Sequence, residues 1–338
     1  MAQRQGPRTG PIRRWAAVLA LAAIVLGACG GAAAPSPSPT EVAKATLPAA
    51  TAAPATAAPA TAAPTATSAP AAVVNIEAGE SDSGFYLKAD RLAVPAGKVT
   101  FNFTNKGKLT HEVMVYPVQD VTTLLGLHRQ DKTADEAALL KGMAGMAEDI
   151  DAGKSATFSG TLAPGFYELA CHARSKDPAG STYTHFDKGQ LLTLAVTGPG
   201  GPATSVATPA STLSLEMKGD EAASWLFVPD RLVVSAGDVA FKVTNNMKVE
   251  HDFVVNPQRD TSKYVSTAVM PGMAHSDDYS SFKGTELIAD LAPGKSDSKT
   301  LKLTPGLYVA ACYMVSKAAD GTSFIHRDRG QRIVFEVR

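Results

Sequence analysis

The sequence has no excess of either charge, few cysteines and a single long apolar run. Lys plus Arg and Asp plus Glu number 32 each among 338 residues. Nucleic-acid binding needs a basic face that attracts phosphate. The equal numbers of acidic and basic residues therefore argue against a nucleic-acid partner. The one apolar run lies near the N-terminus, which excludes a membrane protein with many spans.

The first 29 residues have the organisation of an export signal. Four arginines precede an apolar stretch at 15–26, which is too short for a helix to cross ~30 Å of hydrocarbon. The stretch leads into Leu-Gly-Ala-Cys, which resembles the lipobox of bacterial lipoproteins. The resemblance implies that Cys29 is acylated and becomes the new N-terminus. We expect export and anchoring at the outer face of the bacterial cytoplasmic membrane, the alternative being an ordinary signal peptide that ends near a cysteine.

A low-complexity linker follows the signal. Residues 30–72 are almost entirely Ala, Pro, Thr and Ser. Such a stretch has too little apolar surface to offset the entropy lost on ordering, so we predict a disordered N-terminal tether. Its prolines favour an extended chain of ~3.1 Å per residue.

The rest of the chain is an internal repeat. Matching residues recur 140 positions apart, and 141 apart after one single-residue insertion. We predict two tandem domains, a first copy over 73–198 and a second copy over 212–338, joined by a Gly/Pro-rich linker over 199–211. Each copy has about 125 residues, enough to bury a core of its own. The recurring segments are Asp90-Arg91-Leu92 and Asp230-Arg231-Leu232, Thr104-Asn105 and Thr244-Asn245, Pro164-Gly165 and Pro305-Gly306, and Gly189-Gln190 and Gly330-Gln331.

Within a copy the pattern is that of β-strands. Residues 99–103 and 239–243 alternate apolar and polar side chains, as half-buried strands do. Thr133 and Glu136 have the spacing of a capping box, which predicts one helical interruption near 133–146. Seven or eight short strands per copy predict an all-β protein of two Greek-key sandwiches or barrels. Further strands are predicted over 73–78, 84–89, 111–116, 155–161, 165–171 and 191–196.

One cysteine remains in each copy once Cys29 is assigned to the lipid anchor. Structural disulfides would come in pairs within a domain, so these two cysteines need another explanation. Two imidazoles and one thiolate make a trigonal site that suits copper, because thiolate stabilises Cu(I) and imidazole accepts Cu(II). The candidate ligands at matching positions are His111, Cys171 and His185, and then His251, Cys312 and His326.

These motifs resemble those of the cupredoxins, the blue copper proteins. The shared features are a histidine after an Asn-containing strand end, a Pro-Gly-x-Tyr-x-x-x-Cys run, and a late His-x-x-x-Gly followed by Met or Gln. In that family both histidines and the cysteine are equatorial ligands, and the residue five after the late histidine is axial. The resemblance therefore implies one copper per domain, axial Gln190 and Gln331, and electron transfer as the function.

Two features depart from the family pattern. Thirteen residues separate Cys171 from His185, where the family has two to four. The stretch 177–180 is Asp-Pro-Ala-Gly, a good type I turn, so we predict a hairpin arm that caps the copper or docks a partner. The second departure is Glu112 and Asp252 after the early histidines, where the family often has Asn.

Other interpretations stay open at this stage. The cysteines could be buried core thiols of a metal-free interaction module. The same ligands could serve copper binding or delivery instead of electron transfer. Met314 is an alternative axial ligand, and Met270, Met273 and His275 could form a Cu(I) transfer loop, although a packed loop is the simpler interpretation. His172 has Tyr313 as its counterpart, so we treat it as incidental.

The residue counts argue against an enzyme. A binuclear copper centre of the oxidase type needs two cysteines per site, and a trinuclear cluster needs eight histidines. Only His128, His172 and His275 remain beyond the two candidate sites, and they are not paired. We therefore predict an exported, lipid-anchored carrier of single electrons between redox partner proteins at the cell surface or membrane.

Overall fold

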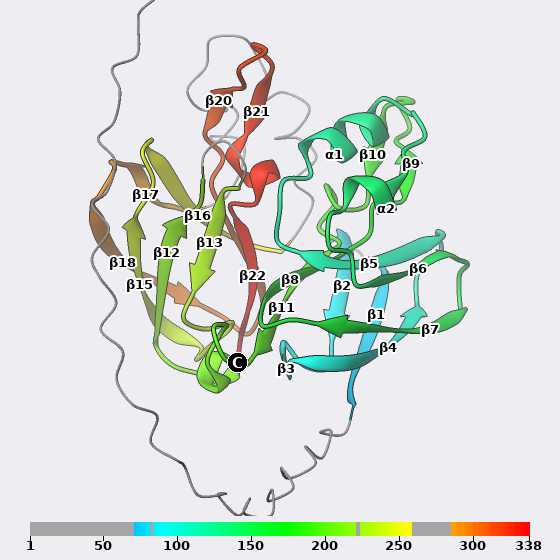
Figure 1. The fold of residues 1–338 in the computed structure, drawn as a ribbon, viewed down its shortest axis with the longest axis horizontal. Coiled ribbons are helices and arrows are strands. Elements are labelled where there is room, and N and C mark those ends of the chain that lie inside the picture. Colours follow the sequence, from blue (N-terminus) through cyan, green and yellow to red (C-terminus); the bar gives the residue numbers. More distant parts are fainter. Residues whose placement is uncertain (1–70, 82–83, 221–223, 259–284) are drawn as a thin grey trace, which may run out of the picture. The chain divides into compact units, whose positions relative to one another are not determined.

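Short β-strands make up most of the part of the chain that the structure describes (Figure 1). The structure is a computed structural model, and it describes residues 71–81, 84–220, 224–258 and 285–338. These residues belong to one unit, 66–338. No helix among them has the length and apolar character needed to cross a membrane. The predicted all-β class is confirmed, whereas Cys29 and the Met270–His275 segment lie outside the described residues.

The first copy contains two sheets. One has the strand order β2-β1-β4-β7 and the other has the order β3-β11-β8-β5-β6. A two-stranded arm, β9-β10, leaves the second sheet between Cys171 and His185. The strands are β1 (Ala72–Ser81), β2 (Gly84–Ala89), β3 (Ala93–Pro95), β4 (Gly97–Asn105), β5 (His111–Pro117), β6 (Gly145–Ile150), β7 (Ser155–Leu162), β8 (Gly165–Ala170), β9 (Arg174–Lys176), β10 (Thr182–Thr184) and β11 (Leu191–Thr197).

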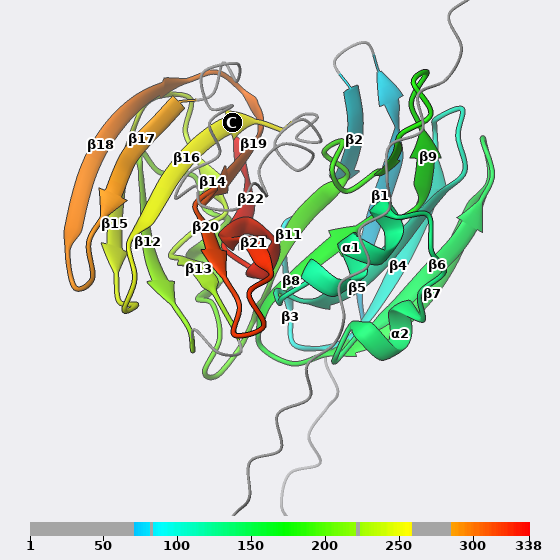
Figure 2. The same ribbon diagram turned by 90° about the horizontal axis from the view of Figure 1, so that it is seen from above.

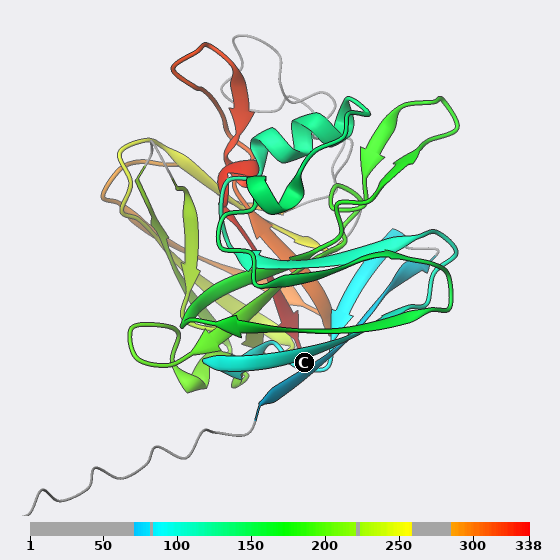
Figure 3. The same cartoon turned by 45° about the vertical axis from the view of Figure 1, so that its right-hand side comes forward.

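The second copy repeats this arrangement strand for strand. Its sheets have the orders β13-β12-β15-β18 and β14-β22-β19-β16-β17, and its arm is β20-β21. Figure 3 shows both arms as hairpins, green and red, that project from the sheets. The strands are β12 (Thr212–Lys218), β13 (Leu226–Pro229), β14 (Val233–Val234), β15 (Gly237–Asn245), β16 (His251–Pro257), β17 (Thr285–Leu291), β18 (Ser296–Leu303), β19 (Gly306–Ala311), β20 (Val315–Lys317), β21 (Ser323–Ile325) and β22 (Arg332–Val337).

The helical prediction is wrong in its details. The helix α2 spans only Glu136–Leu139, and its N-cap is Asp135, whose side chain accepts a hydrogen bond from the Ala138 amide at 3.1 Å. The chain turns at Gly142, with φ of 75°, and enters β6, because strand pairing with β5 outweighs helix propensity there. An unpredicted helix, α1 (Thr122–Arg129), precedes it. Two 3₁₀ turns, η1 (Thr204–Ala207) and η3 (His326–Arg329), complete the described helical elements.

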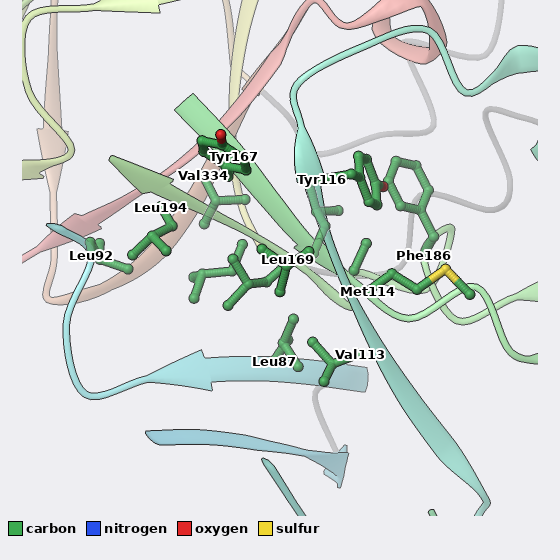
Figure 4. Close-up of a cluster of buried hydrophobic side chains, with 14 of the residues drawn as sticks. Leu87, Leu92, Val113, Met114, Tyr116, Tyr167, Leu169, Phe186, Leu194 and Val334 are labelled. Atoms are coloured by element: carbon green, nitrogen blue, oxygen red, sulfur yellow. The ribbon is translucent and has the colours of Figure 1, made fainter. Parts of the chain in front are cut away.

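Burial follows the strand pattern. In β4 the alternating residues Val99, Phe101 and Phe103 are fully buried, as the sequence predicted for a strand with one solvated face. In β11, residues 191–196 are buried on both faces. The hydrophobic cluster around β11 includes Val334 of β22, which lies among side chains of the first copy (Figure 4).

The two copies are in direct contact along β11 and β22 (Figure 2). The Val334 amide donates a hydrogen bond to the Thr193 hydroxyl at 2.8 Å. The Gln258 side chain donates to the Gly189 carbonyl, also at 2.8 Å. Between the copies, Val206 of η1 is fully buried, and its carbonyl accepts from the Leu232 amide at 2.8 Å.

Candidate metal centres

The early histidine of each copy is presented by a fixed turn. The Asn105 side chain donates to the Leu109 and Ile150 carbonyls, both at 2.7 Å, and accepts from the Gly107 amide at 2.8 Å. These bonds tie the end of β4 to the start of β5, where His111 stands. Asn245 makes the equivalent three bonds before His251. The conspicuous Thr-Asn pair of the sequence therefore positions a candidate ligand.

The cysteine and the late histidine come from the loops that follow β8 and β10. The Cys171 amide donates to the Gln190 carbonyl at 3.1 Å, and the Gln190 amide donates to the His185 carbonyl at 3.0 Å. The same two bonds, at 3.1 and 3.2 Å, link Cys312, Gln331 and His326. The long arm therefore leaves and returns without separating Cys from His, as the hairpin prediction required.

The three donor atoms of the first site converge. His111 Nδ1 lies 3.0 Å from His185 Nδ1, and Cys171 Sγ lies 3.4 Å from His185 Nδ1 and 3.8 Å from His111 Nδ1. All three side chains are buried. Because both imidazoles direct Nδ1 toward one thiol, the group is a candidate binding site for one metal ion.

The second site has nearly the same geometry. His251 Nδ1 lies 3.1 Å from His326 Nδ1, and Cys312 Sγ lies 3.4 Å from His326 Nδ1 and 3.7 Å from His251 Nδ1. These side chains are also buried. The six residues selected from the repeat thus form two separate groups, one within each copy.

The arms cover the late histidines. The Ser175 hydroxyl of β9 lies 2.9 Å from His185 Nε2, and the Ser316 hydroxyl of β20 lies 2.7 Å from His326 Nε2. His185 is only 1% exposed as a result. The prediction missed these serines, although they recur 141 positions apart like the ligands themselves.

One aromatic ring packs against both histidines in each site. The Phe85 ring centroid lies 4.9 Å from that of His185 and 6.3 Å from that of His111. Trp225 occupies the equivalent place, at 4.3 Å from His326 and 5.4 Å from His251. Such rings keep water away from the donors. Their recurrence 140 positions apart was a signal that the sequence interpretation did not use.

Burial sets the protonation state of the metal-free sites. Desolvation lowers the pKa of His185 to about 3, of His251 to about 4 and of His326 to about 2. It also lowers the pKa of His111, although Glu80 opposes that shift. Without a metal the imidazoles are therefore neutral at pH 7 and free to donate a lone pair.

The cysteine thiols are shifted in the other direction. Burial raises the pKa of Cys171 and Cys312 well above the ordinary value for a thiol. A buried thiolate thus needs a cation beside it, as a metal ion would supply. Backbone amides also point at the sulfurs, from Glu112 to Cys171 at 3.4 Å and from Asp252 to Cys312 at 3.3 Å.

The acidic residues that replace the family's Asn have structural contacts. Glu112 Oε1 accepts from the His172 amide at 2.8 Å and so ties β5 to the cysteine loop. Burial raises the pKa of Glu112 to about 8. Asp252 Oδ1 accepts instead from the Asp290 amide at 3.2 Å.

Both glutamines are buried, and both keep an amide oxygen free of hydrogen bonds. Gln190 Nε2 donates to the Gly79 and Tyr86 carbonyls, each at 3.1 Å. Gln331 Nε2 lies 3.3 Å from Met247 Sδ and 3.4 Å from His251 Nε2. An unpartnered buried oxygen is costly, and a bound cation would remove that cost. The residues present therefore fit a copper ion held by two imidazoles and one thiolate. The Gln331 amide lies beside His251 Nε2, the ring nitrogen that faces away from Cys312.

The remaining sequence candidates lie elsewhere. Met314 is in the apolar cluster of the second copy, and its carbonyl accepts from the His326 amide at 3.0 Å. His172 is buried against the Tyr116 hydroxyl, 2.9 Å from its Nε2, and stacks on Phe186. Neither belongs to the two convergent groups.

Comparison with known proteins gives structural matches alone. No protein-family model and no curated protein matches the sequence. Auracyanin from Roseiflexus castenholzii covers 38% of this chain and 99% of its own, with 19% identity and a TM-score of 0.28. Azurin from Methylomonas sp. strain J covers 38% and 98%, with 15% identity and a TM-score of 0.28. Copper nitrite reductase from Nitrosomonas europaea covers 79% and 93%, with 13% identity and a TM-score of 0.28. The chain resembles the cupredoxins and carries a His/Cys/His group in each copy.

Proposed function

We propose that the protein carries single electrons through two type 1 copper sites. The observation that carries the proposal is the convergence of two imidazole Nδ1 atoms and one thiol sulfur, all buried, in both copies. His111, Cys171 and His185 would hold one ion, and His251, Cys312 and His326 the other. Copper held by such a donor set would change its valence by one electron.

The surrounding residues suit this role because they hold the donors in place. The asparagine turns fix the early histidines, and the arm serines fix the late ones. Phe85 and Trp225 exclude water from the donors. Ligands that do not move between oxidation states make electron transfer fast, so a rigid and dry site favours a carrier.

We infer that Gln190 and Gln331 would each offer an amide oxygen as a further ligand to the copper. Their buried Oε1 atoms have no hydrogen-bond partner, which is the feature that supports this assignment. We also interpret the two sheets of each copy as a Greek-key sandwich, with domain boundaries as the repeat predicts them. The paired sheet orders of the two copies support that interpretation.

The proposed carrier would be anchored to the membrane and would exchange electrons with proteins there. We propose that Cys29 carries a lipid, that residues 30–72 are a tether, and that redox proteins at the membrane exchange electrons with the sites. The lipobox-like tetrapeptide and the low-complexity stretch support this. A Cys29→Ser variant should be released from membranes in a fractionation experiment. If the variant stayed fully membrane-bound, the anchor proposal would be wrong.

Electron carriage can be separated from its alternatives by spectroelectrochemistry. Copper-loaded protein should show a thiolate-to-Cu(II) charge-transfer band that disappears and returns reversibly at a defined midpoint potential for each site. A copper delivery protein would lose its metal to a chelator upon reduction instead. A metal-free module would show no band. Oxidase and nitrite reductase assays should give no turnover, since we infer a carrier and not an enzyme.

A further inference from the structure

A carboxylate contacts the early histidine of the first site. Glu80 Oε1 lies 2.8 Å from His111 Nε2, the ring nitrogen that faces away from Cys171. Glu80 also accepts hydrogen bonds from the Lys108 amide at 2.7 Å and the Leu109 amide at 3.3 Å. His111 is fully buried and the Glu80 side chain is 20% exposed. The negative charge is therefore fixed beside a ligand of the first site.

This contact depends on a glycine. A Cβ atom at Gly107 would lie 2.9 Å from Glu80 Cδ and closer still to Glu80 Oε2. In the second copy the corresponding residue is Met247, whose buried side chain reaches the Gln331 amide. The residue that corresponds to Glu80 is Asp220, which is one methylene shorter and exposed.

The second site consequently lacks the carboxylate. His251 Nε2 faces the Gln331 amide nitrogen at 3.4 Å, and no described carboxylate forms an ion pair with His251. Both sites keep a serine on the late histidine, an aromatic ring over the histidine pair and a buried glutamine. The ring is Phe85 in the first site and Trp225 in the second, and the two glutamines contact different partners. At Nε2 of the early histidine, the contrast is therefore a carboxylate in the first site and an amide in the second.

A carboxylate that accepts the ring N–H of a metal-bound histidine makes the imidazole a stronger donor. It also adds negative charge near the metal, which favours the more positive oxidation state. We propose that Glu80 lowers the reduction potential of the first site below that of the second, so that electrons pass from the first copper to the second. This inference rests on the proposed copper sites.

The contact between the copies brings the two candidate sites close to each other. Arg327, next to His326, lies 3.7 Å from the carboxylate of Asp187, which is two residues after His185. Both side chains are buried. The late-histidine loops of the two sites therefore meet at this ion pair, one residue from His326 and two residues from His185.

The test measures each site alone. In a Cys312→Ala background the first site is observed, and in a Cys171→Ala background the second. Glu80→Gln should raise the potential of the first site by at least the equivalent of a tenfold change in the Cu(II)/Cu(I) affinity ratio, ~59 mV for one electron. Glu80→Asp keeps the charge but shortens the side chain, and it should also raise the reduction potential of the first site. The potential of the second site should not change in either variant.

Glu250→Gln is the matched control, because Glu250 is exposed and next to His251. It should shift the reduction potential of the second site far less than Glu80→Gln shifts the potential of the first. Equal shifts from both variants, or a first site whose potential is not the lower one, would overturn the proposal.

A zinc measurement separates this inference from the proposed function. Zn(II) is redox-inactive, and Glu80→Gln should weaken its binding to the first site about tenfold or more. If zinc binding falls while the copper shows no reversible potential, the carboxylate acts as inferred but the carrier function fails. If zinc binding is unchanged, the role of Glu80 is refuted.

Discussion

Arg332 of β22 and Glu168 of β8 form an ion pair between the two copies, and neither side chain is exposed. Arg332 Nε donates to Glu168 Oε1 at 2.6 Å, and a second guanidinium nitrogen contacts the other oxygen. Glu168 lies three residues before Cys171, and Arg332 follows Gln331 directly. The pair therefore joins the segments that carry ligands of the two sites.

Breaking this pair should destabilise the protein strongly, because an unpaired buried charge would remain. We expect Arg332→Met to lower the free energy of unfolding by about 3–5 kcal/mol, measured by urea denaturation. Adding Glu168→Leu should restore most of the loss. Arg338→Met breaks the exposed pair with Glu336 and should cost at most about 1 kcal/mol. Equal losses at both positions would contradict the buried pairing.

The free energy of unfolding of the metal-free protein should decrease as the pH is lowered. The folded pKa values of His185, His251 and His326 lie below the value near 6.5 of an unfolded chain, so the unfolded state binds more protons. The stabilisation is present above pH 6.5 and is lost as the pH falls toward 3. Each histidine contributes up to about 1.4 kcal/mol per pH unit in that window. Denaturation at pH 7 and pH 5 measures the slope, and equal stabilities would contradict neutral buried imidazoles.

Glu112 has the opposite effect and provides a control. Its pKa is raised to about 8, so the folded state binds more protons than the unfolded state between pH 4.5 and 8. Its contribution to stability therefore falls as the pH rises. We expect Glu112→Gln to make the loss of stability from pH 7 to pH 5 steeper than in the parent protein.

The arm serine should matter for metal affinity. Ser175 holds His185 through Nε2, so Ser175→Ala should weaken Zn(II) binding at the first site by about tenfold to a hundredfold in a chelator competition. Ser181→Ala changes the same arm at an exposed position and should have little effect. Similar losses in both variants would indicate that the arm acts as a whole and that the serine contact is unimportant.

The proposed role of the two glutamines as copper ligands can be tested by measuring the reduction potential of each site. An amide oxygen is a harder donor than a thioether, so it favours Cu(II). Gln331→Met should raise the potential of the second site, and Gln190→Met that of the first; a tenfold change in the affinity ratio corresponds to ~59 mV. Unchanged potentials and spectra in both variants would leave Met314, a backbone carbonyl or no axial ligand as the remaining choices.

The internal repeat explains what the sequence could predict. Both His/Cys/His groups and most strands were predictable because their residues recur at matching positions. The ion pair between the copies could not be predicted from the repeat. Glu168 corresponds to Val309 in the second copy, and Arg332 corresponds to Leu191 in the first. Glu80 and Gly107 were missed for the same reason, because the contact of Glu80 with His111 occurs in one copy only. The helix near 133–146 is shorter than predicted, because strand pairing of β6 with β5 begins at Gly145.

Copper content combined with visible absorption tests the central claim most directly. The account predicts two copper ions per chain and an intense thiolate-to-Cu(II) band in the loaded protein. Cys171→Ala and Cys312→Ala should each reduce the content to about one ion and the band by about half, and the double variant should abolish both. A loaded wild-type protein without the band, or a single cysteine variant that loses both ions, would contradict two independent copper sites.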